Sequence, residues 1–230
     1  MPQPEQSADS QYAQYMRVDE LLRLQTPIHE RAHRDELLFQ VAHQATELWL
    51  SVAVEASQEA VWQMNIGEIG PAELLVHKAA DAIHTVTSQL EMFSHLSPAA
   101  FAALRPRLGS GSGAQSPGWQ AVGQTGRALY TAFELLCAKR GIVLAEVYRW
   151  RADQPIYRLA ERLVDWDEAV SLWRTRHHLL ASRLVGAEGI GTQGTPVGLL
   201  SRSTAHRYFP GLWAVRTDMT QPDGRDAGVA

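Results

Sequence analysis

Residues 35–64 read DELLFQVAHQATELWLSVAVEASQEAVWQM, and the periodicity of this stretch decides the fold class. Phe39, His43 and the pair Leu48 and Trp49 recur at steps near four or five, which is the spacing of one face of an amphipathic helix. The chain has no convincing run with the two-residue period of a strand. We therefore predict an all-α protein.

Further helices are expected on both sides of this segment. Ser97 followed by Pro98 is typical of a helix start, because Ser caps free N–H groups and Pro fits the first turn. Asp165, followed by further acidic residues, also resembles a helix start. Residues 109–118 have the glycine- and serine-rich composition of a flexible linker, and residues 189–198 form a second glycine-rich loop. The expected helices cover residues 12–24, 74–93, 98–108, 119–148, 157–187 and 203–219.

Composition narrows the class of protein. The chain has 230 residues, of which 45% are hydrophobic and 20% charged, as in ordinary globular proteins. The net charge of −4 gives no basic surface for nucleic acid, and no apolar run approaches the ~20 residues of a membrane span. The N-terminus lacks the features of a secretory signal, and the single cysteine, Cys137, excludes an internal disulfide. We expect a cytoplasmic protein with a loose arm over residues 1–11 and a disordered tail over residues 220–230.

Residues 29–33, HERAH, match the HExxH pattern of zinc proteases, in which two histidines one helical turn apart bind zinc. Pro27 places the motif at a helix entry, and no third histidine follows at metzincin spacing. We interpret it as a chance match, although a distant glutamate as third ligand keeps a zinc protease as an alternative. Residues 189–194 match GxGxxG, but they follow a helix instead of a strand, so a helix cap is the better interpretation.

Two histidines lie on apolar helix faces. His43 shares a face with Phe39, and His177 shares one with Trp173. An axial haem ligand has this pattern, but so does a histidine of an ordinary core, and the pattern alone favours the core.

A third face carries an arginine among apolar residues. Phe101, Arg105 and Leu108 lie on one side of the expected helix over residues 98–108. A guanidinium on a buried stripe is costly unless it meets a carboxylate, which could belong to the protein or to a substrate.

Several blocks together resemble the tryptophan 2,3-dioxygenase family, a family of haem oxygenases. The strongest are DELLFQVAHQATELW, similar to HDExLFxxxHQxxELW, and the block ending in GAEGIGTQGTPVGLL, similar to WRxxHxxxVxRxIGxKxGTGGSSGxxYL. The remaining blocks resemble YxxYLxLDxLLxxQ, FxxFRxxLxxxSGFQS and FPELWxxRTxL. They occur in the family's order and cover most of the chain, at residues 12–25, 35–49, 96–116, 172–200 and 209–219.

The resemblance implies a single haem-binding helical domain over residues 1–230 with haem b as cofactor. His177 stands at the position of the axial ligand of the haem iron, and Ser112 at that of a serine beside the haem. His43 matches the histidine that hydrogen-bonds the indole N–H. The resemblance also places the cofactor between the helices of the domain. It makes the Ser/Gly-rich residues 109–118 a loop of the substrate site instead of a linker.

The resemblance also implies how L-tryptophan or a close derivative is bound. Arg105 matches the arginine that pairs with the substrate carboxylate, and Thr192 matches the threonine that helps to hold the ammonium. Tyr12 and Tyr15 match tyrosines that an N-terminal helix lends to a neighbouring subunit, so a homo-oligomer, dimer or tetramer, is expected. The apolar walls of the indole pocket are assigned to Phe39, Phe101 and Leu108.

Departures from the family pattern leave the reaction open. Ala114 replaces a phenylalanine, Gly123 stands at the place of an acid, and residues 191–196 read GTQGTP instead of GTGGSS. The family default is insertion of both atoms of O2 into the indole C2–C3 bond, giving N-formyl-kynurenine. The alternative is insertion of one atom into a substituted tryptophan, such as a β-methyl derivative, giving a 2-oxindole or hydroxy-indole in natural-product biosynthesis.

A different class of function is a non-enzymatic haem- or indole-binding protein that has lost its activity. The retention of the whole set of site residues argues against it, since a site without activity has no need of Phe39, His43, Arg105, His177 and Thr192.

Overall fold

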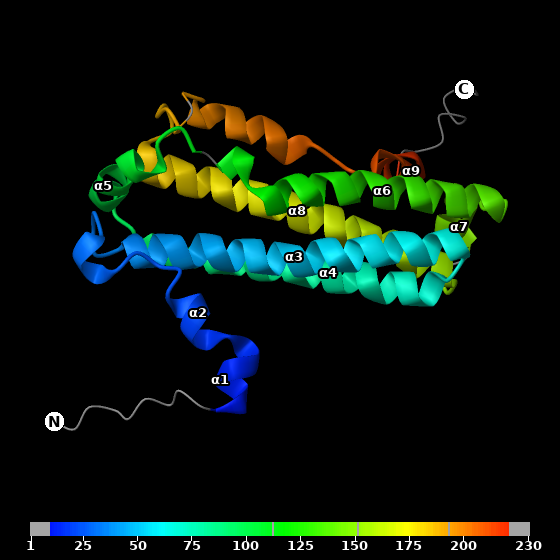
Figure 1. Cartoon of the computed structure of the whole chain (residues 1–230). Coiled ribbons are helices and arrows are strands. Elements are labelled where there is room, and N and C mark those ends of the chain that lie inside the picture. Colours follow the sequence, from blue (N-terminus) through cyan, green and yellow to red (C-terminus); the bar gives the residue numbers. More distant parts are fainter. Residues whose placement is uncertain (1–9, 112, 151, 193, 221–230) are drawn as a thin grey trace, which may run out of the picture.

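Four long helices, parallel or antiparallel to one another, form the body of the protein in the computed structural model (Figure 1). The structure describes residues 10–111, 113–150, 152–192 and 194–220. The long helices are α3 (Glu36–Ile66), α4 (Ile69–Gln89), α6 (Pro117–Lys139) and α8 (Pro155–Val185). Among the described residues there is no strand, only an isolated bridge between Ile190 and Pro196, so the all-α prediction is confirmed.

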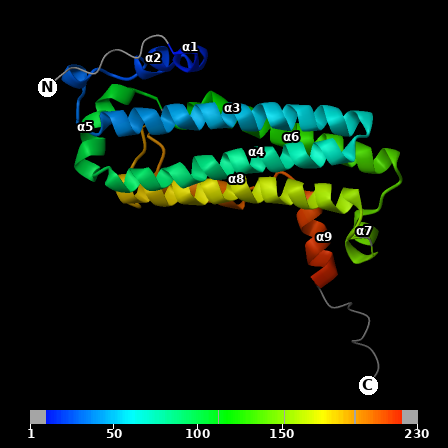
Figure 2. The same cartoon turned by 90° about the horizontal axis from the view of Figure 1, so that it is seen from below.

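Small residues let three pairs of these helices pack closely. The closest pairs are α3 with α4, α4 with α8 and α3 with α6, as the view from below also shows (Figure 2). Ala53, Ala60 and Ala79 are almost completely buried where α3 and α4 meet their neighbours. Alanine side chains allow helix backbones to approach without a cavity between them. The bundle is therefore tight along its length on these sides.

Large aromatic residues fill the space between α6 and α8. Trp166 and Phe133 are fully buried. A Cβ at Gly126 would lie 2.7 Å from the Trp166 ring, so only glycine leaves room for that ring at this position. Other residues of α6 and α8 line a cavity at one end of the bundle.

The shorter elements close the ends of the bundle. The helix α5 (Pro98–Leu108) follows the 3-10 turn η2 (Leu90–His95) at the end with the cavity, and α7 (Leu144–Trp150) lies at the other end. Ser97 caps α5 by accepting a hydrogen bond from Ala100 N, as its sequence predicts. The remaining 3-10 turns are η1 (Ile28–Glu30), η3 (Gly113–Gln115) and η4 (Val197–Ala205).

A buried carboxylate fixes the C-terminal segment to α8. Oδ2 of Asp167, which is fully buried, accepts hydrogen bonds from the backbone N–H groups of Tyr208 and Phe209 and from Nε1 of Trp213. These contacts position α9 (Pro210–Thr220) against the bundle. The helix expected over residues 157–187 is confirmed, but the helix start expected at Asp165 is wrong, because α8 runs without a break from Pro155.

The N-terminal segment differs from the single helix expected over residues 12–24. It forms α1 (Gln11–Met16) and α2 (Val18–Leu22), separated at Arg17, which has a left-handed backbone with φ of 50°. Both helices stand away from the bundle (Figure 1). Residues 1–9 and 221–230, where the loose arm and the tail were expected, lie outside the described residues. In the described part of the chain, no helix is long and apolar enough to cross a membrane.

Candidate active site

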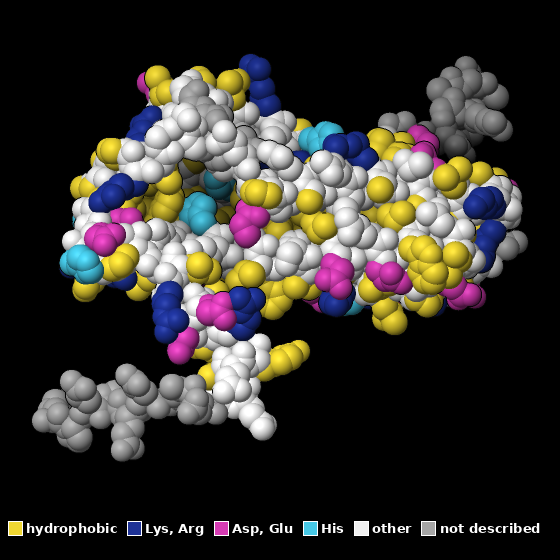
Figure 3. All heavy atoms as spheres, viewed as in Figure 1, with side chains coloured by type: hydrophobic (Ala, Val, Ile, Leu, Met, Phe, Trp, Pro, Cys, Tyr) yellow, Lys and Arg dark blue, Asp and Glu magenta, His cyan; other side chains and the backbone are white. Residues whose placement is uncertain are grey.

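A cavity of about 640 Å3 opens at the end of the bundle where α5 lies. The space-filling view shows it as a hollow with histidine side chains on its inner surface (Figure 3). Its walls come from α3, η2, α5, α6 and α8 and from the two glycine-rich loops. A volume of this size is typical of a site for a small-molecule ligand or cofactor.

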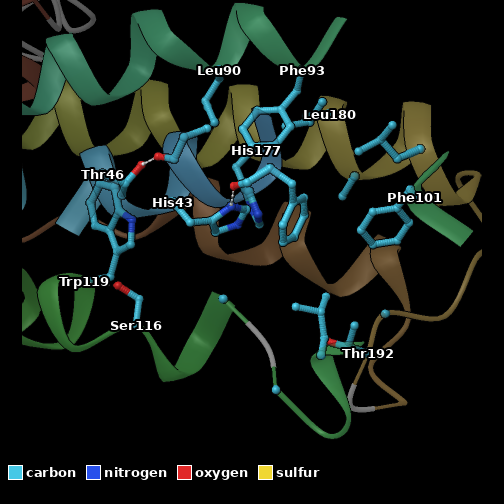
Figure 4. Close-up of a pocket in the computed structure, with 18 of the residues that line it drawn as sticks. His43, Thr46, Leu90, Phe93, Phe101, Ser116, Trp119, His177, Leu180 and Thr192 are labelled. Atoms are coloured by element: carbon cyan, nitrogen blue, oxygen red, sulfur yellow. Dashed lines mark hydrogen bonds between the residues drawn. The ribbon is translucent and has the colours of Figure 1, made fainter. Parts of the chain in front are cut away.

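His43 faces the cavity from α3 (Figure 4). Its Nδ1 lies 2.7 Å from the carbonyl oxygen of Phe39, one turn earlier on the same helix. A carbonyl can only accept, so Nδ1 carries the proton and Nε2 is left as an acceptor. Burial lowers the pKa of His43, while the Phe39 carbonyl and the charge of Glu47 oppose this effect. His43 therefore offers a neutral acceptor nitrogen to a ligand.

His177 faces the same cavity from α8, which α4 separates from α3. Burial, together with the charges of the neighbouring His43 and His178, lowers its pKa to about 4. The imidazole is therefore neutral at pH 7, which is the form that binds a metal. A Cβ at Gly113 would lie 4.0 Å from Nε2 of His177, so the backbone of η3 comes close to this nitrogen.

Indole rings pack beside His177. Trp173 lies one turn earlier on α8, with its ring parallel to the imidazole within 7° and the centroids 4.8 Å apart. Trp119 of α6 packs against Trp173 at a centroid distance of 3.8 Å. The Nε1 groups of both tryptophans are buried without a hydrogen-bond partner among the described residues.

Aromatic side chains form the wall between His43 and α5. The Phe39 ring lies 4.2 Å from the His43 ring, 6.1 Å from that of Phe93 and 6.2 Å from that of Phe101, measured between centroids. Leu180 packs against the same cluster. Edge-on and tilted aromatic contacts of this kind suit a flat aromatic ligand.

Arg105 lies at the rim of the cavity and connects α5 to the second glycine-rich loop. Its Nη2 donates hydrogen bonds of 2.9 Å to the carbonyl oxygens of Ile190 and Gly191. For the described part of the chain, no hydrogen bond uses its Nε or Nη1 group. The next residue of the loop, Thr192, lines the cavity. Arg105 thus has donors left for an anionic group beside Thr192.

A carboxylate of α3 holds the first glycine-rich loop in place. Oε1 of Glu47 accepts a hydrogen bond of 2.5 Å from Ser116 Oγ, and Oε2 accepts one of 2.9 Å from Gly118 N. Ser116 also caps α6 by accepting from Trp119 N. The linker interpretation of residues 109–118 is therefore wrong, because this segment is part of the cavity wall.

Most of the residues expected at the site meet at the cavity. Arg105 is at its rim, whereas Tyr12 and Tyr15 are 69% and 84% exposed on α1 and do not line it. Ser112 lies outside the described residues. The residues that line the cavity as expected are Phe39, His43, Phe101, Leu108, His177 and Thr192.

The zinc-protease alternative conflicts with the local backbone. His29 and Glu30 lie in the 3-10 turn η1, and Arg31 after it is extended, so the two histidines of the motif are not one helical turn apart. In the described ranges, no group of three or more His, Cys, Asp or Glu side chains could hold a metal ion.

Sequence reasoning missed part of the cavity wall. Glu47 had a usable signal, because it lies one helical turn from His43. Ser116, Phe93 and Trp119 had none, since their contacts join distant parts of the chain.

Comparisons with known proteins show which sequences this chain resembles. The sequence model of the family described as tryptophan 2,3-dioxygenase matches residues 2–125. A tryptophan 2,3-dioxygenase of Saccharopolyspora erythraea is 29% identical, over an alignment that covers 90% of this chain and 92% of the relative. Those of Xanthomonas oryzae pv. oryzae and Herpetosiphon aurantiacus are 28% and 27% identical, and each alignment covers 90% of this chain.

Proposed function

The chain belongs to the tryptophan 2,3-dioxygenase family, whose members are haem-dependent oxygenases, and we propose that it inserts oxygen from O2 into the indole ring of L-tryptophan or a close derivative. The observation that carries the proposal is the pair of neutral histidines, His43 and His177, that face one apolar cavity from separate helices. One offers a metal ligand and the other a hydrogen-bond acceptor.

The residues around the cavity fit haem b. His177 supplies a single neutral imidazole, which is sufficient for haem but not for a bare metal ion. The buried N–H groups of Trp119 and Trp173 lack acceptors among the described residues, and a ligand with carboxylate groups could provide them. An unsatisfied buried donor costs about 1–3 kcal/mol, so such a ligand would relieve an unfavourable state. His177 would hold the iron, and η3 would lie beside the bound group.

The chain's own residues would orient the substrate, while haem, when bound, supplies the binding and activation of O2. Nε2 of His43 would accept the indole N–H, since its Nδ1 proton is engaged by Phe39. The rings of Phe39 and Phe101 would hold the indole plane. The free donors of Arg105 would bind the substrate carboxylate, and the hydroxyl of Thr192 would bind the ammonium. Together these contacts fix which indole carbon meets the oxygen.

Dioxygenation to N-formyl-kynurenine is the first candidate reaction, and insertion of a single oxygen atom is the second. One observation at the rim of the cavity favours the second reaction. Arg105 bonds the carbonyls of Ile190 and Gly191, directly before the stretch that departs from the family pattern at Gln193 and Thr195. A loop with a different sequence at the amino-acid end of the substrate would change the pose of the indole.

Product mass tests the proposal and separates the two reactions. The haem-loaded protein is incubated with L-tryptophan and β-methyl-tryptophan under O2 and a reductant. A product that gains two oxygen atoms supports dioxygenation, and one that gains a single atom supports the second reaction. A haem-loaded protein that converts no indole substrate contradicts the proposal and favours a binding protein.

A homo-oligomer is part of the proposal. Tyr12 and Tyr15 lie on an exposed arm whose base is held to α3 by hydrogen bonds between Thr26 and Gln40. Such an arm can complete the cavity of a second copy. Light scattering combined with the assay tests this, and a fully active monomer would contradict it.

A further inference from the structure

The imidazole of His177 is contacted by an aromatic ring instead of a carboxylate or carbonyl of the described residues. Such a histidine normally donates its second ring N–H to a carboxylate, a backbone carbonyl or water. His43 has a partner of this kind in the carbonyl of Phe39. For His177 the described residues provide no such hydrogen bond from the protein, whereas Trp173 provides a ring contact.

The ring of Trp173 occupies the position from which His177 can be oriented. The two rings are parallel within 7° at a centroid distance of 4.8 Å, and both belong to α8. Trp119 in turn packs against Trp173 at 3.8 Å, with 33° between the planes. These contacts link the imidazole through two indole rings to another helix.

Trp119, at the far end of the stack formed by His177, Trp173 and Trp119, is fixed by hydrogen bonds. Trp119 lies in the first turn of α6, where its backbone N–H is bound by Ser116 Oγ. Ser116 is itself bound by the carboxylate of Glu47 on α3. The position of Trp119 is therefore set by a helix cap and by a second helix, and it cannot shift without breaking these bonds.

We propose that Trp173 and Trp119 are positioning residues that orient the His177 imidazole by stacking. The inference rests on the proposed function, because it concerns His177 as the ligand of haem. A ligand histidine without an anionic hydrogen-bond partner donates less charge to the iron. The reduced form of the bound haem is then favoured, which is the form that binds O2.

The buried indole N–H groups suggest a competing role for the same residues. If Trp119 acts only as a hydrogen-bond donor to the bound haem, the surface of its ring does not matter. Every replacement that lacks a side-chain N–H should then weaken haem binding equally. If it acts by stacking, a smaller aromatic ring preserves most of its effect. Variants that separate ring from N–H therefore decide between the two roles.

The test compares Trp119→Leu, which removes the ring, with Trp119→Phe, which keeps a ring but removes the N–H. The matched control is Trp62→Leu, because Trp62 is exposed on α3 and does not line the cavity. The measurements are the rate of haem transfer to an excess of a haem-free globin and the iron–histidine stretching band of the ferrous holoprotein. The second reports the orientation and charge donation of His177, which a merely structural role would not change.

Stacking predicts that Trp119→Leu accelerates haem loss by about tenfold and shifts or broadens the iron–histidine band. Trp119→Phe is expected to lose haem more slowly than Trp119→Leu and to keep the wild-type iron–histidine band, and Trp62→Leu to match the wild type in both measurements. If Trp119→Leu does not fold, Trp119→Met takes its place, since it keeps more of the buried volume. Its expected results are the same.

Two results would overturn the inference while leaving the proposed function intact. One is a non-aromatic variant with the wild-type haem-loss rate and band. The other is an equal defect in the Phe and Leu variants, which would assign the effect to the N–H group. A wild-type protein that takes up no haem would overturn the proposed function together with this inference.

Discussion

His43 and His177 line one cavity and lie on similar apolar helix faces, yet their surroundings differ. His43 is held by a hydrogen bond to its own helix, beside the charge of Glu47. His177 is stacked on Trp173, and its pKa falls to about 4.

The difference separates two tasks that the residue type alone does not distinguish. A histidine with one proton fixed by a carbonyl is suited to accept a hydrogen bond from a substrate. A neutral histidine held by ring contacts is suited to bind a metal. We propose that the contacts around each ring, and not the helical pattern, determine these tasks. The predictions below test whether the two histidines can be told apart by experiment.

The largest expected effect is the loss of haem on replacing His177. His177→Ala removes the ligand of the iron, so the purified variant should show no Soret band. His43→Ala should retain its haem. His178→Ala is the matched control, because this residue is the next on α8 but does not line the cavity. Normal haem content in His177→Ala would refute the assignment.

The next largest effect is expected at Arg105, at the rim of the cavity and away from both histidines. Arg105→Ala should raise KM for the amino-acid substrate about 30-fold or more, because a desolvated charge pair is worth about 2–5 kcal/mol. Steady-state kinetics measures this. Tryptamine, which has no carboxylate, is the control and should be converted equally by both proteins. An unchanged KM for tryptophan would remove Arg105 from the substrate site.

The pH dependence of haem binding sharpens the comparison. Haem binding requires the neutral imidazole, and the lowered pKa keeps His177 neutral until the pH falls through about 4. The affinity is therefore full above that pH and is lost below it. Soret titrations at pH 7.5 and 5.5 should agree within about twofold, whereas an ordinary pKa of 6.5 would weaken binding about tenfold at the lower pH.

The smallest effect is expected at His43. His43→Leu removes one hydrogen bond to the indole, worth about 1 kcal/mol, so kcat/KM should fall about fivefold at full haem content. Tryptophan methylated on the indole nitrogen serves as the control substrate, because it cannot donate this hydrogen bond. Its kcat/KM should therefore be the same for the wild type and His43→Leu. A complete loss of activity would mean that His43 does more than orient the substrate.

Helices with strong periodic patterns were predictable from sequence. The segment expected over residues 35–64 is α3, Glu36–Ile66, and Ser97 caps α5 as predicted. The break at Arg17 was not predictable, because it depends on backbone geometry outside the local pattern.

The candidate site was predictable only in part. The resemblance to a known family brought together residues on α3, α5 and α8 that periodicity left unconnected. It did not reveal the link from Glu47 through Ser116 to Trp119, since that link joins residues about 70 positions apart. The hydrogen bond that orients His43 and the ring contact that orients His177 are also visible only in the folded structure.

The most direct test of the account is the absorption spectrum of the reduced protein with and without CO. The account predicts a Soret band that shifts when CO binds opposite His177, in the wild type and in His43→Ala but not in His177→Ala. A protein with no Soret band after reconstitution with haem, or a band that persists in His177→Ala, would contradict it.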